Sequence, residues 1–341
     1  MTLRSRIGGA LRALRGRTAQ PAVGNDAPRN ELGRAIEAVA AAPIKEVQAR
    51  GYHLQKRDYY SALNDLFFLE ENPDLWHGRA LPASIAWDID AQVAELRQLA
   101  PYVSELAEVT MDPPPGPPRF HWNNDFWRGA DAAIHYGLLR DVKPRRVVEI
   151  GAGWSSLLMA EALERNRTEG GEPTDVHQIE PYPRTELLSA LPADWKLHEV
   201  ILQRADLALF ESLEPGDVCF YDGSHVARAG SDVVWFFFEI LPQLQPGVLV
   251  HIHDIFWPND YPDEWIFERG QTWNEQYVLQ AFLMYNDAFE VIVCNSMLTY
   301  SRPEAMKQLF QGVAETQHSG VSVWLRRTAH GGVVDESNID S

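Results

Sequence analysis

The stretch VVEIGAGWSS, residues 147–156, decides the fold prediction. An apolar run through Glu149 is typical of a buried strand, and Gly151 and Gly153 make a tight turn into a helix. Two glycines let the backbone approach a ligand, and the first turn of the helix has unpaired N–H groups. Ligands of open α/β sheets bind beyond the carboxyl ends of the strands. We therefore expect a binding site at this turn, and expect a side chain at Gly151 to obstruct the ligand or strain the backbone.

Short apolar runs alternate with helical patterns around this turn. We expect strands over 146–150, 176–180, 197–202, 218–222, 248–254, 289–295 and 321–327, and helices over 155–164, 185–191, 230–244 and 274–285. Such alternation is typical of a Rossmann-like, seven-stranded, mostly parallel α/β sheet with helices on both faces. No clear crossover separates the last two strands, which favours an antiparallel final strand.

The chain before the first strand has a different composition. Residues 31–110 are expected to form a helical N-terminal cap over the ligand edge of the sheet, and its clearest helix, over 91–106, is capped by Asp88 or Asp90. The proline-rich connector, residues 111–120, cannot continue a helix and marks the boundary with a domain over 121–328. Residues 329–341 are expected to be a loose tail.

Residues 1–30 are expected to be a basic tail and linker. Five arginines and the apolar spacing of Ile7, Leu11 and Leu14 suit weak contact with an anionic membrane, but a disordered tail is the favoured interpretation. Neither a signal peptide nor a run of ~20 apolar residues is present, so we expect no stable membrane insertion and a cytoplasmic location. The net charge of -18 disfavours a nucleic-acid partner. Cys219 and Cys294 lie in apolar runs and are expected to be buried thiols.

Glu180, at the end of the second expected strand, is the second element of the site. Its two carboxylate oxygens suit the hydroxyls of a ribose, and its distance from Gly151 is close to that of the ribose-binding acid in nucleotide folds. A dinucleotide fingerprint would place a third glycine where Ser156 stands. The pattern thus favours a nucleoside ligand and disfavours a nicotinamide enzyme.

The motifs EIGAGWSS, IEP, CFYDGSH and VHIHDIF together resemble class I S-adenosylmethionine-dependent methyltransferases, and more narrowly the bacterial branch called methyltransferase domain family 24. The similarity covers roughly residues 119–300, and GYHLQKRDYYS (51–61) also resembles that branch. The resemblance implies S-adenosylmethionine as the cofactor. It implies the following cofactor-binding residues: Glu149, Gly151 and Gly153 around the methionine part, Glu180 on the ribose, Gln203 near the adenine, and Asp222.

Asp222 and Asp254 each end an expected strand and should lie beside the cofactor turn. Two carboxylates suit a divalent cation, and related metal-dependent O-methyltransferases use acids at these strand ends. His253 stands where some relatives carry a second acid, and Ile255 where others carry asparagine. A site of Asp222, Asp254 and His253 would favour a transition metal over Mg²⁺, but these departures favour a metal-free site.

Histidines near these acids are the candidates for proton transfer. We take Asp222, His225 and His253 as the catalytic residues, while His251 is expected to be a core residue. The aromatic loop, residues 255–277, is long for its position and rich in aromatic and polar side chains, which suits a sugar but also suits packing. Packing is the preferred interpretation for Trp122 and Trp127.

Together these features predict a methyltransferase acting on a hydroxyl of a small molecule or glycan. The alternatives are an NAD(P)-dependent oxidoreductase and a non-catalytic module that keeps the cofactor pocket.

Overall fold

The computed structural model describes residues 31–78 and 83–329, which form two compact units, one ending at Asp65 and the other beginning at Leu66. The predictions for residues 1–30 and for nearly all of the tail over 329–341 lie outside the described residues. Within the described part of the chain, no helix combines the length and apolar character needed to cross a bilayer.

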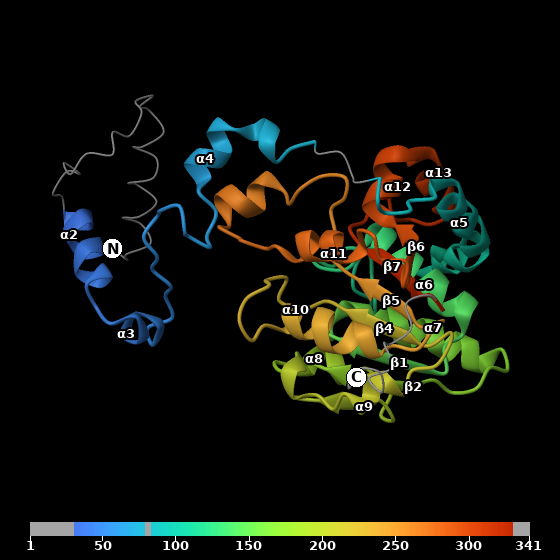
Figure 1. Ribbon diagram of the computed structural model, residues 1–341. Coiled ribbons are helices and arrows are strands. Elements are labelled where there is room, and N and C mark those ends of the chain that lie inside the picture. Colours follow the sequence, from blue (N-terminus) through green and yellow to red (C-terminus); the bar gives the residue numbers. More distant parts are fainter. Residues whose placement is uncertain (1–30, 79–82, 330–341) are drawn as a thin grey trace, which may run out of the picture. The chain divides into compact units, whose positions relative to one another are not determined.

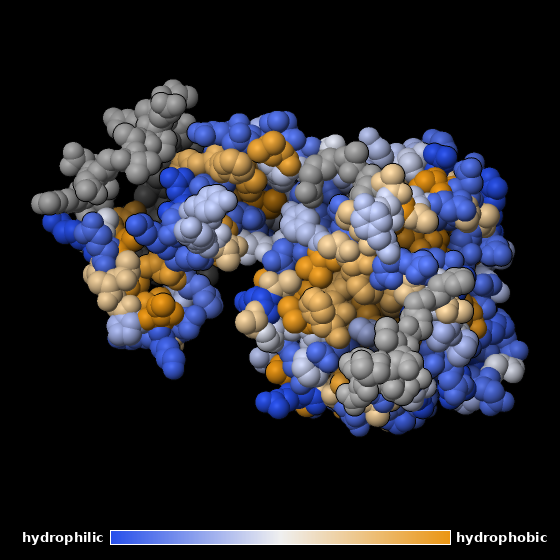
Figure 2. Space-filling view, in the orientation of Figure 1, coloured by the Kyte–Doolittle hydropathy of each residue, from blue (hydrophilic) through white to orange (hydrophobic). Residues whose placement is uncertain are grey.

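The first unit contains α2 (Glu31–Ala40) and α3 (Ile44–Gln48), and residues 51–65 add no further helix or strand. Leu32, Ile36 and Val39 share one face of α2 and are 44–51% exposed, and Figure 2 shows apolar surface on this unit. The helical pattern here is therefore that of an amphipathic helix whose apolar face is not buried within its own unit.

The second unit holds the sheet (Figure 1). Its strands are β1 (Arg146–Ile150), β2 (Asp175–Ile179), β3 (Lys196–His198), β4 (Val218–Tyr221), β5 (Leu249–Ile252), β6 (Phe289–Cys294) and β7 (Val323–Arg327). They lie in the order β3-β2-β1-β4-β5-β7-β6. Only β7 runs antiparallel to its neighbours, which confirms the expected seven-stranded, mostly parallel sheet with an antiparallel final strand.

Helices cover both faces of this sheet (Figure 1). The α-helices are α4 (Leu66–Glu71), α5 (Ile89–Val103), α6 (Gly129–Val142), α7 (Trp154–Thr168), α8 (Thr185–Leu188), α9 (Ala208–Glu211), α10 (Asp232–Trp235), α11 (Glu275–Leu283), α12 (Asn295–Ser301) and α13 (Pro303–Leu309). Single 3₁₀ or π turns are η1 (Pro73–Leu75), η2 (Ser104–Glu108), η3 (Leu202–Arg204), η4 (Phe236–Ile240), η5 (Leu241–Gln243) and η6 (Glu264–Glu268).

Alternating side chains of each strand enter two separate apolar cores. Val147 and Phe220 face the core beneath α5, α6 and α7, whereas Val148 and Tyr221 face the core beneath α10, η4 and α11. This period of two is what a strand buried on both faces requires. Cys219 and Cys294 are buried free thiols, as expected.

Two expected elements are shorter than their apolar runs. β3 ends at His198 because the Val200 N–H bonds the His198 carbonyl and closes a tight turn. The helix expected over 230–244 is divided into α10, η4 and η5, and Pro242, which has no N–H to donate, lies in the last of these turns.

Helix α5 packs on α6, α13 and β6, and the Asp88 side chain caps it, as predicted. The proline-rich connector lies inside the second unit and is tied back by the Trp122 N–H, which bonds the Thr110 carbonyl. Helix α5 therefore covers a face of the sheet. The assignment of 31–110 as one cap stays a prediction.

Candidate active site

The turn after β1 has the geometry that its glycines predict. Gly151 has a φ of +85°, and a Cβ there would overlap the carbonyl oxygen of Asp222 at the end of β4. Gly153 has an extended φ of -174° and open space around its Cα. The constraint on Gly151 thus comes from the neighbouring strand as well as from its backbone conformation.

Glu149 lies beneath the turn and is fully buried. Its carboxylate accepts hydrogen bonds from Ser155 Oγ at 2.8 Å, Ser156 Oγ at 2.7 Å and Gln178 Nε2 at 2.6 Å. Burial raises the pKa of Glu149 to about 7. Both oxygens are therefore engaged within the protein, and Glu149 shapes the turn from below and does not line the cavity above it.

A cavity of about 300 Å³ lies directly above the turn. Glu180 lines it, just beyond the end of β2, and its carboxylate accepts from the Ala152 and Tyr182 N–H groups at 3.3 and 2.7 Å. The full lining is Phe126, Trp127, Gly151, Ala152, Gly153, Trp154, Ser155, Glu180, Tyr182, Arg184, Asp222 and Gly223. The strand-end positions of Gly151, Glu180 and Asp222 bring these three expected residues together.

Eight of the lining residues were not predicted to bind the cofactor, among them Phe126, Tyr182 and Arg184. Tyr182 is 84% exposed, and the Arg184 guanidinium lies over the Phe126 ring, 4.5 Å from its centroid. Tyr182 and Arg184 follow Glu180 closely in sequence, and that proximity was the available signal. Gln203 is absent from this lining, because its amide donates to the Gly230 carbonyl at 2.7 Å.

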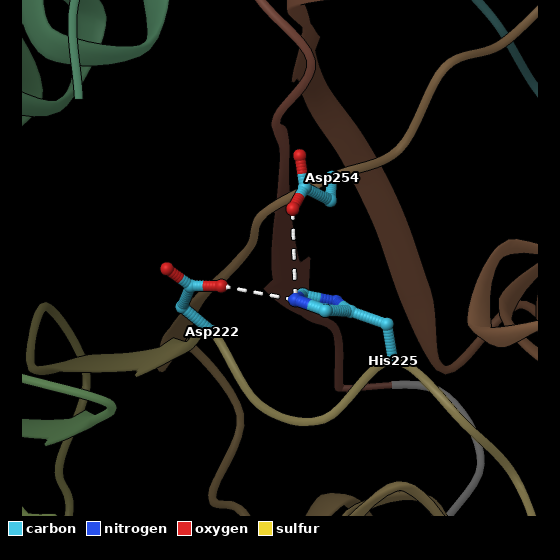
Figure 3. Close-up of side chains that lie close together, drawn as sticks. All are labelled: Asp222, His225 and Asp254. Carbon is cyan, nitrogen blue, oxygen red and sulfur yellow. Dashed lines mark ion pairs between the residues drawn. The ribbon is translucent and has the colours of Figure 1, made fainter. Parts of the chain in front are cut away.

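Asp222, His225 and Asp254 meet at the carboxyl ends of β4 and β5 (Figure 3). His225 Nε2 lies 3.3 Å from Asp222 Oδ1 and 3.5 Å from Asp254 Oδ2. Their candidate ligand atoms all lie within 4.8 Å of one another. His225 and Asp254 have φ values of +61° and +58°, a conformation that costs free energy outside glycine and is concentrated at functional sites.

Glu275, the first residue of α11, holds His225 from the other side. Its Oε2 lies 2.8 Å from His225 Nδ1, and Glu275 is fully buried. Burial alone would lower the pKa of His225, but the Asp222 and Glu275 carboxylates raise it to about 10. Glu275 was not predicted, because it lies 50 residues from its partner in the sequence.

His253 completes the cluster and is held by Asp131. Its Nε2 lies 3.6 Å from Asp131 Oδ2, and its Nδ1 lies 3.7 Å from both Asp222 Oδ1 and Asp254 Oδ2. This Nδ1 is buried and has no hydrogen-bond partner. Burial would lower the pKa of His253, but the surrounding carboxylates raise it well above its usual range. The cluster therefore contains an unused nitrogen donor that faces two acids.

Of the remaining aromatic and histidine residues, some pack in the core and others lie at the site. His251 is fully buried and stacks between Phe220 and Trp324, which agrees with its assignment to the core. Trp127 is buried with its ring 4.6 Å from that of His253, and it also forms part of the cavity wall. In the aromatic loop, Trp273 lies 4.1 Å from the His225 ring, so this loop reaches the cluster.

Residues 148–255 match the family model described as a methyltransferase domain. This segment therefore has the sequence pattern of a methyltransferase domain. The match runs from β1 through Asp254 and so includes the glycine turn, Glu180 and both strand-end acids. The matched segment thus contains both strand-end acids of the cluster and all of the cavity lining except Phe126 and Trp127.

Comparison with individual proteins gives more distant similarities. An uncharacterized protein of Archaeoglobus fulgidus is 31% identical over 97 residues, which are 28% of this chain and 42% of that protein, so the match spans less than half of the relative. The apo structure of CmcI is 19% identical and covers 59% of this chain and 71% of its own, with a TM-score of 0.33. The MycE methyltransferase of the mycinamycin biosynthetic pathway, in complex with Mg and SAH, is 16% identical. The match covers 69% of this chain and 56% of the MycE chain, with a TM-score of 0.33.

Proposed function

We propose that this protein is an S-adenosylmethionine-dependent methyltransferase that methylates a hydroxyl of a small molecule or glycan. The observation that carries the proposal is one sheet edge on which a nucleoside-sized cavity, lined by Gly151 and Glu180, adjoins a cluster of carboxylates and imidazoles. Asp222 belongs to both, because it lines the cavity and contacts His225. Such an edge suits a cofactor and a proton-accepting group at adjacent positions.

The residues around the cavity fit the cofactor part by part. Glu180 offers carboxylate oxygens for the ribose hydroxyls, and the backbone at Gly151 and Gly153 permits close approach. Arg184 supplies a positive charge for the amino-acid carboxylate, and Tyr182 an exposed aromatic face for the adenine. When bound, S-adenosylmethionine supplies an electrophilic methyl group; the protein's part is to orient it and to remove a proton from the acceptor.

His225 is the residue that we assign to proton removal. Glu275 engages Nδ1, which fixes the ring orientation and leaves Nε2 directed at the strand-end acids. The Asp222 and Glu275 carboxylates raise the pKa of His225 to about 10, so an unassisted imidazole would be protonated at neutral pH and unable to act as a base. A metal-free site would have to overcome this raised pKa before His225 could accept a proton.

A divalent cation resolves that difficulty, and the donor set fits one. Asp222, Asp254 and the unpartnered Nδ1 of His253 face one another and would hold it. Bound there, the cation would neutralise Asp222, one of the two acids that keep His225 protonated, and it would polarise an acceptor hydroxyl. Two carboxylates with an imidazole favour a transition metal over Mg²⁺. We therefore include a metal in the proposal, although the sequence pattern alone favoured its absence.

The alternative functions fit the geometry less well. The fingerprint of a dinucleotide fold has a third glycine at the position of Ser156. Here the Ser156 hydroxyl donates to Glu149 and accepts a hydrogen bond from the Gly153 N–H at 3.0 Å. A non-catalytic module would need no charged cluster beside its cavity, where buried carboxylates and imidazoles are expensive to maintain.

The same proposal places the protein in the cytoplasm without a nucleic-acid partner. Cys219 and Cys294 are free thiols, which suits a reducing compartment, and the net charge of -18 opposes phosphate binding.

The test is the release of S-adenosylhomocysteine from S-adenosylmethionine in the presence of a panel of hydroxylated acceptors. His225→Ala is expected to lower turnover about 100-fold or more, the usual contribution of a general base. His198→Ala is the matched control, since that imidazole lies on β3 beside His177 and outside the cluster. Equal turnover in the wild type and His225→Ala would contradict the assigned base.

A further inference from the structure

Asp131, in the first turn of α6, is a buried acid that is not among the residues lining the cofactor cavity. Its Oδ1 accepts hydrogen bonds from Asn295 Nδ2 at 2.9 Å, the Val321 N–H at 2.8 Å and Ser322 Oγ at 2.6 Å. These donors come from α12 and from the segment that leads into β7. Three donors on one oxygen fix the orientation of the carboxylate.

The backbone around Asp131 leaves little room for the carboxylate to move. A Cβ added at Gly320 would meet Asp131 Oδ1 at 2.7 Å, so the chain before β7 packs directly against this oxygen. The Ala130 N–H bonds the Ser319 carbonyl at 2.9 Å, which ties the start of α6 to the same segment. A helix N-terminus also favours a negative charge. The second oxygen of Asp131 therefore has a fixed direction.

That second oxygen faces His253. Asp131 Oδ2 lies 3.6 Å from His253 Nε2. On the opposite side of the ring, Nδ1 lies 3.7 Å from Asp222 Oδ1 and 3.7 Å from Asp254 Oδ2. The Trp127 ring packs on the imidazole with 4.6 Å between the ring centroids. The imidazole is thus held with one nitrogen directed at Asp131 and the other at the proposed metal ligands.

The two nitrogens of a neutral imidazole have different roles, because one bears the proton and the other the lone pair. Nδ1 can bind a cation between Asp222 and Asp254 only through its lone pair, so the ring proton must then be on Nε2. A carboxylate beside Nε2 stabilises that tautomer and makes Nδ1 a stronger donor. The distance of 3.6 Å exceeds an ordinary hydrogen bond, so the stabilisation is mainly electrostatic.

We propose that Asp131 is the positioning residue of the metal site: it keeps the His253 proton on Nε2 and so directs the Nδ1 lone pair at a divalent transition metal. The inference rests on the proposed function and adds to it the residue through which the site selects its cation. Oxygen ligands suit Mg²⁺, whereas an imidazole nitrogen suits Co²⁺ and Zn²⁺. Asp131 acts through His253 and requires no contact with the cofactor.

The test is calorimetric titration of the full-length wild type and Asp131→Asn with Co²⁺ and, separately, with Mg²⁺. The amide keeps one oxygen for the surrounding donors but removes the charge that faces Nε2. Co²⁺ affinity is expected to fall about 10- to 100-fold, the usual effect of losing such a partner of a ligating histidine. Mg²⁺ affinity is expected to change much less, because its oxygen ligands remain. Asp141→Asn is the matched control, since Asp141 is an exposed acid on the same helix.

Two further measurements keep the inference testable if Asp131→Asn weakens the fold. Asp131→Asn in a His253→Gln background is expected to cause no further loss of Co²⁺ affinity, because the two residues act together. In the Zn²⁺-loaded wild type, long-range ¹H–¹⁵N NMR is expected to show His253 protonated at Nε2, its signal being assigned by its loss in His253→Gln. Protonation at Nδ1 would overturn the inference without any change at Asp131.

The remaining outcomes separate this inference from a structural role and from the function on which it rests. Equal losses of Co²⁺ and Mg²⁺ affinity in Asp131→Asn would leave Asp131 a structural role only. If the wild type binds S-adenosylhomocysteine but neither cation, the inference is wrong and the cofactor assignment stands. If S-adenosylhomocysteine fails to bind, the proposed function is wrong, whereas a selective loss of Co²⁺ in Asp131→Asn would still support the role of Asp131.

Discussion

Gly151→Ala is the substitution whose effect the structure specifies most closely. The φ of +85° costs an alanine about 1–2 kcal/mol. Its Cβ would also overlap the Asp222 carbonyl oxygen, which is backbone and can yield only if the end of β4 moves. Overpacking of this kind costs about 1–3 kcal/mol. We therefore expect a loss of roughly 2–5 kcal/mol in the free energy of unfolding, together with weaker cofactor binding because Asp222 is displaced.

Urea unfolding of Gly151→Ala and Gly153→Ala, side by side, measures this effect. Gly153 lies two residues away in the same turn, but its backbone is extended and its Cβ position is open, so its alanine variant should remain within about 0.5 kcal/mol of the wild type. Similar losses in both variants, or no loss in Gly151→Ala, would refute the argument that β4 restricts the turn.

Three other outcomes follow from the site. Glu180→Ala should lower the affinity for S-adenosylhomocysteine about 10- to 100-fold, because hydrogen bonds to a charged acceptor are lost; a change below about twofold in calorimetry would place the ribose elsewhere. Asp254→Ala should remove bound divalent metal, measured by elemental analysis, while cofactor binding persists; full metal retention would exclude Asp254 as a ligand. The pKa of Glu149 is raised from 4.5 to about 7, so the stability present below pH 4.5 is lost as the pH rises through 7. The free energy of unfolding of Glu149→Gln, measured relative to that of the wild type, should therefore rise by about 3 kcal/mol between low pH and pH 8. Parallel curves of unfolding free energy against pH would contradict this.

The strands could be predicted from short-range sequence patterns, namely apolar runs followed by turn residues. The strand over 146–150 was predicted to the residue, since an apolar run followed by a glycine turn has few other folds. The predicted strands include all seven of the described sheet, but α6 was missed. It is buried on almost all sides, so its sequence has no polar face and no amphipathic period.

The site depended more on contacts between distant residues. Gly151, Glu180 and Asp222 were predictable because strand ends of a parallel sheet share one edge. Glu149 was expected at the ligand, but the hydroxyls of Ser155 and Ser156 bind it from α7, and its burial depends on that packing.

The partners of His225 and His253 come from outside the motifs. Glu275 and Asp131 reach His225 and His253 from α11 and α6, and no spacing along the chain indicates either contact. The charge state of the cluster follows from these partners. The sequence favours a metal-free site because His253 and Ile255 replace the acid or amide of some relatives, whereas the cation that we propose rests on the contacts of Asp222, Asp254 and His253.

The central claim is that the cavity above Gly151 binds S-adenosylmethionine. Isothermal titration of the purified protein with S-adenosylhomocysteine, and separately with NAD, tests it most directly. We expect saturable binding of S-adenosylhomocysteine and no comparable affinity for NAD, because Ser156 occupies the position of the third glycine. Tight binding of NAD with no heat from S-adenosylhomocysteine would contradict it.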